Sequence, residues 1–164
     1  MKERASRPTA GVIRRLPVFV FLLLMIAVPG DLFAALGGDP GSVQADQAHL
    51  QASVRSIRKA AYTVQELHAP TGTVVREYVS PGGSVFGVAW EGPWPPDMHQ
   101  LLGAYFDQYA RAMQSASGSR MGRRPVHIEL PGLVMEVAGH ARSFTGRAYV
   151  PQMLPQGMSA GEIR

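Results

Sequence analysis

The sequence predicts an α+β fold in which an antiparallel sheet of five or six strands packs on one amphipathic helix, in the order β-β-β-α-β-β. Two observations lead to this prediction. Short runs rich in β-branched and aromatic residues alternate with turns that contain proline and glycine. Between the third and fourth runs, apolar residues recur at three- and four-residue steps, which is the period of a helix.

The first three runs are predicted to form a meander of antiparallel strands. They cover residues 62–67, 73–79 and 84–91. The turns between them, at 69–72 and 80–83, contain proline and glycine. Turns this short join neighbouring strands of a hairpin, so each strand should pair with the next one along the chain.

A helix is predicted to follow the proline-rich break at 92–96. Asp97 is placed as its N-cap, and Gln100 stands three residues later, where it can complete a capping box. One broad apolar stripe is formed by Met98, Leu101, Leu102, Tyr105, Phe106, Tyr109 and Met113. This stripe should cover one face of the sheet.

Further strands are predicted after a polar loop. They cover residues 126–130, 133–137 and 144–150, with Pro131-Gly132 and Gly139-His140 at the turns. The residues from Pro151 onward contain no clear element.

The start of the chain has the three parts of a secretory signal peptide. Basic residues precede an apolar run of 13 residues at 16–28, and small residues follow at Ala34-Ala35. The run is shorter than the ~20 residues that cross a bilayer as a helix. We expect residues 1–34 to be removed on export by the secretory route. The alternative is an uncleaved signal that anchors a structural protein in the membrane.

The remainder is predicted to hold one domain. Residues 35–60 are expected to be a linker with a short helix over 46–61, because Leu50, Val54 and Ile57 share a helical stripe. Residues 61–155 are the single α+β domain, and 156–164 are a tail.

Charge and composition exclude several classes of function. Five of the sixteen basic residues and two of the twelve acidic residues lie within 1–34. The mature chain therefore keeps eleven basic and ten acidic groups, a balance that does not support nucleic-acid binding. The chain has no cysteine, which excludes disulfides, thiolate catalysis and cysteine-ligated zinc.

Several segments together resemble a known family. They are residues 72–79, 85–93, 96–97 and 101–106, then 139–140, 144–149 and 154–155, with Ala35-Leu36-Gly37-Gly38 at the mature start. These segments are similar to a family of exported bacterial proteins catalogued as domain of unknown function 2844. The resemblance covers residues 35–38 and 60–164, and it implies export and the domain limits without implying an activity.

Candidate binding residues are Trp94, Trp90, His140 and Arg147. Trp94 is the strongest of them, because a tryptophan between prolines in a loop can offer a rigid contact surface. Trp90 fits a core position equally well. Arg147 and the pair Arg76-Glu77 are explained by cross-strand or buried ion pairing without any activity.

Metal binding and acid–base catalysis are the alternatives to a binding module. His127 and Glu129 alternate on one predicted strand and point to the same face, and His140 stands at a strand end. A metal site of His127, Glu129 and His140 is geometrically conceivable. A small metal-dependent or acid–base enzyme would use His140 with His127, Glu129 or Glu136. A solvated sheet face is the simpler interpretation of the same residues.

The sequence therefore favours an exported protein of the periplasm or envelope that acts as a non-enzymatic binding module, with no cofactor. The expected partner is an envelope protein or a cell-surface component, and the membrane is expected to be involved only through an uncleaved signal. The alternatives are a small metal-dependent or acid–base enzyme and a membrane-anchored structural protein.

Overall fold

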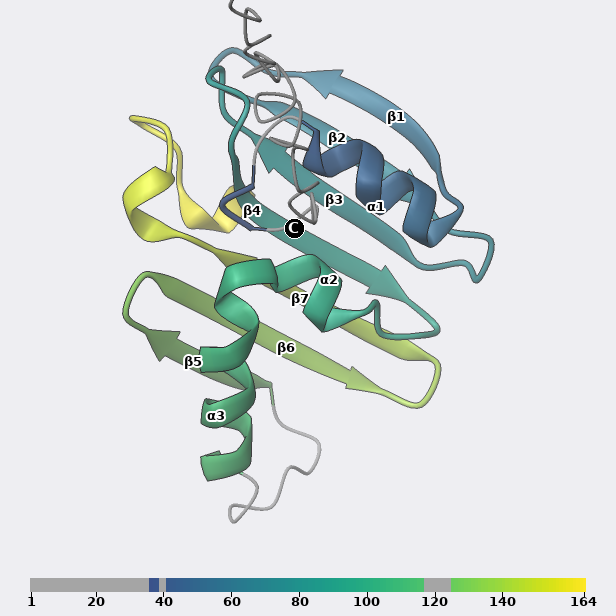
Figure 1. Ribbon diagram of the computed structural model, residues 1–164, viewed down its shortest axis with the longest axis vertical. Coiled ribbons are helices and arrows are strands. Elements are labelled where there is room, and N and C mark those ends of the chain that lie inside the picture. Colours follow the sequence, from purple (N-terminus) through teal and green to yellow (C-terminus); the bar gives the residue numbers. More distant parts are fainter. Residues whose placement is uncertain (1–35, 39–40, 117–124) are drawn as a thin grey trace, which may run out of the picture. The chain divides into compact units, whose positions relative to one another are not determined.

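Within the described residues, seven strands form one antiparallel sheet with the spatial order β1-β2-β3-β4-β7-β6-β5 (Figure 1). The computed structural model describes residues 36–38, 41–116 and 125–164. The strands are β1 (Ser53–Arg58), β2 (Thr63–His68), β3 (Val74–Val79), β4 (Val85–Gly92), β5 (Val126–Leu130), β6 (Leu133–His140) and β7 (Ser143–Tyr149).

Three α-helices lie across one face of this sheet (Figure 1). They are α1 (Ser42–Leu50), α2 (Met98–Leu102) and α3 (Phe106–Ala116). A single 3₁₀ turn, η2 (Gly103–Tyr105), connects α2 to α3. Two more 3₁₀ turns, η3 (Pro151–Met153) and η4 (Ala160–Glu162), follow the last strand. We call the sheet surface under the helices the helix face, and the opposite surface the outer face.

Each face of the sheet has its own hydrophobic cluster. On the helix face, the apolar stripe of α2 and α3 packs on buried strand residues such as Val75, Trp90 and Met135. On the outer face, Tyr78 and Phe86 pack against Ile163 from the C-terminal segment. Since strand residues alternate between faces, a sheet covered on both sides needs apolar residues in both registers, and β4 is buried along most of its length for this reason.

Close approach explains two glycines in the central strands. A Cβ at Gly87 would lie 2.7 Å from Cδ1 of Ile163, and a Cβ at Gly146 would overlap the indole of Trp90. Neither position has room for a side chain. Gly146 thus lets Trp90 lie flat over β7, and Gly87 lets Ile163 enter the outer face.

The predicted fold class is confirmed as an α+β fold with one antiparallel sheet, but the predicted strand count is wrong. Seven strands are present where five or six were expected. The predicted runs at 62–67, 73–79, 84–91, 126–130, 133–137 and 144–150 correspond to β2, β3, β4, β5, β6 and β7. The additional strand is β1, which pairs with β2 along its whole length.

Strand β1 lies in the segment that was predicted to be a linker with a helix over 46–61. The helix begins earlier, at Ser42, and ends at Leu50. Gln51 then adopts a left-handed conformation with a φ of 49°, which reverses the chain into β1. The spacing of Val54 and Ile57 suits a helix, but six cross-strand pairs with β2 decide the outcome.

The helix predicted from Asp97 exists with the predicted N-cap. The Asp97 carboxylate accepts hydrogen bonds from the main-chain N–H groups of His99 and Gln100. Gly103 then takes a φ of 48° and interrupts the helix, so that α2 and α3 are separate. The capping box is not formed, because the Gln100 side chain donates instead to Asp46.

The described segments on both sides of residues 61–155 contain secondary structure of their own. One compact unit covers Asp31–Arg164, and it includes both the expected linker and the expected tail. In the tail, η4 has a capping box between Ser159 and Glu162, and Ile163 is completely buried. The predicted signal peptide, 1–34, lies outside the described residues. In the described part of the chain, no helix has the length and apolar character to cross a membrane.

Candidate functional site

A row of side chains crosses the outer face from one edge of the sheet to the other. Cross-strand pairing places one of these residues on every strand, each beside the next. In spatial order they are Arg55, Glu66, Arg76, Ala89, Arg147, Glu136 and His127. Opposite charges therefore stand side by side on both halves of the sheet, an arrangement that stabilises strand pairing. Only the small Ala89 separates Arg76 from Arg147.

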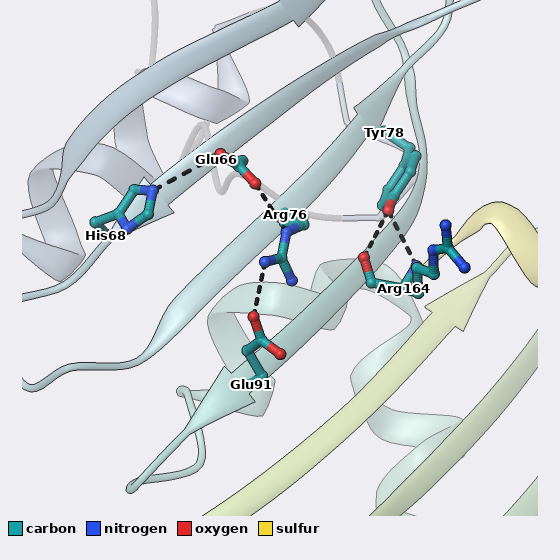
Figure 2. A network of polar contacts seen from close by, with 6 residues as sticks. All are labelled: Glu66, His68, Arg76, Tyr78, Glu91 and Arg164. Atoms are coloured by element: carbon teal, nitrogen blue, oxygen red, sulfur yellow. Dashed lines mark hydrogen bonds and ion pairs between the residues drawn. The ribbon is translucent and has the colours of Figure 1, made fainter.

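Arg76 is the centre of one half of this row (Figure 2). Its Nε donates to Glu66 at 2.9 Å, and its Nη2 donates to Glu91 at 2.7 Å. The hydrogen bond from Arg76 lowers the pKa of Glu66, which is therefore ionised at neutral pH. Glu66 also lies 3.8 Å from Nε2 of His68. The guanidinium is thus fixed by two carboxylates that arise from neighbouring strands.

Arg147 occupies the corresponding place in the other half. Its Nε and Nη2 donate to the two carboxylate oxygens of Glu136, each at 3.0 Å, in a bidentate pair. The hydrogen bond from Arg147 lowers the pKa of Glu136. The remaining nitrogen, Nη1, donates to the main-chain oxygens of Ala160 at 2.8 Å and Ile163 at 3.3 Å. Arg147 therefore holds the C-terminal segment on the outer face.

A pocket of about 390 Å³ opens between the two arginines. Its charged lining consists of Arg76, Arg147, Arg164, Glu91 and Glu136, and Ile163 contributes an apolar wall. Arg164 is held there by Tyr78 (Figure 2), whose hydroxyl accepts from the main-chain N–H of Arg164 at 3.0 Å and donates to its main-chain oxygen at 2.9 Å. Three arginines and two glutamates thus line one concave surface.

A different polar group lies on the helix face, where two carboxyl groups are buried between α1 and the sheet. Glu77 of β3 is 1% exposed, and Asp46 of α1 is 2% exposed. Burial, together with the hydrogen bond and charge of Asp46, raises the pKa of Glu77 from 4.5 to about 10. Burial raises the pKa of Asp46 from 3.8 to about 6, while hydrogen bonds from Glu77 and Gln100 act in the opposite direction. Gln100 donates to Asp46 at 2.7 Å.

The two predicted tryptophans have opposite environments. Trp90 is 2% exposed and belongs to the core on the helix face, and it is also one of the residues that line the pocket between the arginines. Trp94 is 59% exposed. It borders a cleft of about 380 Å³, together with Pro70, Pro95 and the end of α1. Trp94 stays a predicted contact residue.

The residues considered for metal binding are not brought together. Nδ1 of His127 lies 3.5 Å from Glu136, and not beside His140. His140 is exposed, and its Nδ1 lies 3.3 Å from the main-chain oxygen of Ala141. Glu129 pairs across the strands with Val134. Among the described residues, no group of three or more histidine, aspartate or glutamate side chains is arranged to hold a metal ion.

The sequence predicted ion pairing for Arg76 and Arg147, but it did not predict the two buried carboxyl groups. Cross-strand ion pairing was predicted for Arg76 and Arg147, and both have it. Glu77 was grouped with the same pairing, yet it faces the core, and no basic partner is found for it in the described part of the chain. One signal was available: Glu77 stands between Val75 and Val79 on the inward register of a strand. Asp46 offered no such signal, because it was placed at the start of a short helix within a predicted linker.

The contrast between the tryptophans gives a direct test of the core. Trp90→Ala should lower the free energy of unfolding by about 3–5 kcal/mol, because it leaves a large cavity over β7. Trp94→Ala should change it by less than about 1 kcal/mol, because the ring is exposed. Urea denaturation of both variants measures the difference. An equal loss for the two variants would contradict the placement of Trp94 on the surface.

Comparison with known proteins identifies the family without identifying an activity. No curated protein and no solved structure gives a significant match. The family model described as a protein of unknown function, DUF2844, matches residues 32–163, so the chain belongs to that family.

Proposed function

We propose that the protein is a non-enzymatic binding module whose outer-face pocket binds a small anionic ligand that carries a carboxylate or phosphate group. The observation that supports this proposal most strongly is the convergence of Arg76, Arg147 and Arg164 on one pocket of about 390 Å³. A concave surface with a few convergent polar groups is the usual form of a ligand site. Guanidinium groups suit planar and tetrahedral oxyanions because they donate two parallel hydrogen bonds.

The two central arginines are suited to different tasks. Arg147 uses Nε, Nη1 and Nη2 in hydrogen bonds with the protein itself, so it contributes mainly charge and position. Arg76 uses Nε and one Nη2 hydrogen bond, and no protein acceptor for its Nη1 is found in the described part of the chain. Arg76 is therefore the residue with N–H donors to spare for a ligand.

The carboxylates of the pocket limit its affinity for an anion. Glu91 and Glu136 offset two of the three arginine charges in the lining. Glu91 is also the more exposed of the two, and it competes directly with a ligand for Arg76. Binding should therefore be weak for simple ions and should decrease with added salt.

Titration of the protein with inorganic phosphate and with acetate at low salt tests this proposal, with binding followed by NMR chemical-shift changes. Saturable shifts should appear on β3, β4 and β7. Arg76→Gln should weaken binding about tenfold or more, the effect of losing a hydrogen bond to a charged group. Glu91→Gln should strengthen binding, because it removes the competing carboxylate.

Arg55→Gln is the matched control. Arg55 belongs to the same cross-strand row, but it lies on the edge strand β1, outside the pocket. It should leave the affinity unchanged. An equal loss of affinity in Arg55→Gln and Arg76→Gln would mean that only net charge matters, which would contradict a specific pocket. Unchanged affinity in Arg76→Gln would contradict it as well.

A partner protein or cell-surface component at Trp94 is the second candidate, which the exposure of that ring supports. The enzyme alternative gains no such support. His140 is exposed, and the only interaction found for it in the described part of the chain is with the main-chain oxygen of Ala141. A general base needs a substrate site within hydrogen-bond reach, and neither of the two clefts described above includes His140.

Export is also proposed, on the strength of the sequence at 1–34. The intact mass of the protein, purified from the cell envelope through a short C-terminal tag that binds no metal, tests it. A chain that begins at Ala35 would support cleavage and a periplasmic location. A chain that retains residues 1–34 would contradict cleavage and favour the membrane-anchored alternative.

A further inference from the structure

Helix α1 is attached to the sheet by a polar contact as well as by apolar packing. Its buried residues are Ser42, Val43 and Asp46, and Leu50 is partly buried at its end. Val43, which is 7% exposed, is thus the one apolar side chain of α1 that is buried. A nine-residue helix with so little apolar surface gains little from packing, because helices in proteins depend on the burial of an amphipathic face. The contact of Asp46 with Glu77 therefore matters for its position.

The chemistry of this contact requires a proton. If both groups were carboxylates, neither would have a hydrogen to donate, and both oxygens of Glu77 would remain buried without a partner. Two negative charges would also repel each other where water cannot screen them. One proton removes both problems, because Glu77 can then donate an O–H hydrogen bond to Asp46 while Gln100 donates to Asp46 as well.

Among the described residues, no buried positive charge acts on the pair. Across β3, Glu77 has Gln65 and Val88 as its cross-strand neighbours, and both are uncharged. The charged groups that act on Asp46, apart from Glu77, are His49 of α1 and Asp97 at the start of α2. Those two side chains are about half exposed and lie 3.6 Å apart, so their charges largely offset each other when His49 is protonated.

The same helix forms one wall of the Trp94 cleft. His49, Leu50 and Gln51, at the end of α1, line the cleft opposite Trp94 and Pro95. Movement of α1 away from the sheet would therefore remove this wall and widen the cleft. No such link connects α1 to the arginine pocket, whose lining contains no residue of that helix.

We propose that Asp46 and Glu77 form a proton-controlled latch: a proton shared between the two carboxyls holds α1 on the sheet, and its loss to solvent releases the helix and opens the Trp94 cleft. The device is independent of anion binding at the arginine pocket.

The direction of the pH effect follows from the two pKa values. Both are raised in the closed form, to about 6 for Asp46 and about 10 for Glu77, above the ordinary values that apply once α1 is released. The closed form therefore binds more protons than the released form and loses stability as pH rises. Between about pH 6 and pH 10 the difference is one proton, so the opening constant of α1 should rise about tenfold per pH unit.

Amide hydrogen exchange of α1, corrected for the intrinsic exchange rate, measures that opening constant. We expect α1 amides to open more readily than those of β6 and to show the tenfold rise per pH unit. Glu77→Gln should abolish the rise, because the neutral amide donates to Asp46 at every pH and cannot ionise. Asp97→Asn is the matched control. It removes a nearby exposed carboxylate, keeps an N-capping side chain, and should leave the slope unchanged.

Two results would overturn the latch. One is exchange of α1 only through the same global opening as β6 at every pH, and the other is an unchanged slope in Glu77→Gln. If Glu77→Gln does not fold, the proposal can still be tested in the wild-type protein by following the ionisation of Glu77 and the exchange protection of α1 together. Ionisation of Glu77 that coincides with loss of α1 protection supports the latch, and ionisation with α1 still protected contradicts it.

Discussion

The burial of Glu77 on the helix face constrains how this domain can be assembled. An ionised carboxylate placed there would cost several kcal/mol, because Glu77 is buried and no basic side chain of the described residues pairs with it. The protein meets the constraint by placing a second carboxyl, Asp46, against the first and retaining a proton. Gln100 then connects the same group to α2. The position of α1, the start of α2 and the inward register of β3 consequently depend on one shared hydrogen.

The outer face treats charge in the opposite way. There the carboxylates remain ionised, since Arg76 and Arg147 lower the pKa of Glu66 and Glu136. A single cross-strand row places a charged or titratable side chain on every strand except β4, where the small Ala89 leaves space between the arginines. The pocket is thus a consequence of sheet register, and a shift by one residue would move the row into the core. The helix face of the sheet therefore carries a carboxyl pair that shares a proton, and the outer face carries a row of ionised side chains.

The sequence predicted the parts of this fold that depend on local chemistry. Turns with proline and glycine delimit β2, β3 and β4, and the capping geometry of Asp97 was readable from a single residue and its position. Strand β1 was not predicted, because its register with β2 is a tertiary property and its apolar spacing also suits a helix. The destination of the Gln100 side chain was missed for a related reason, since it depends on a contact with the distant Asp46.

Candidate site residues followed the same division. Trp94 was singled out because a tryptophan between prolines is a local feature of the sequence, and Arg147 was singled out because it lies in a segment that resembles the family. The sequence left open whether Trp90 is a core or a contact residue, because the space that Gly146 leaves for its ring depends on strand pairing. Asp46 could not be identified from the sequence, because its partner Glu77 lies 31 positions away in the chain and on a different element.

The protonation state of Glu77 is the most direct test of the central claim. The ¹³C chemical shift of its side-chain carboxyl carbon, followed as a function of pH in the wild-type protein, reports that state. We predict that the carbon keeps the shift of the protonated acid through neutral pH and changes only well above it. A transition near the ordinary glutamate pKa of 4.5, with α1 still in place, would show that Glu77 is ionised in the folded protein and would contradict the shared proton.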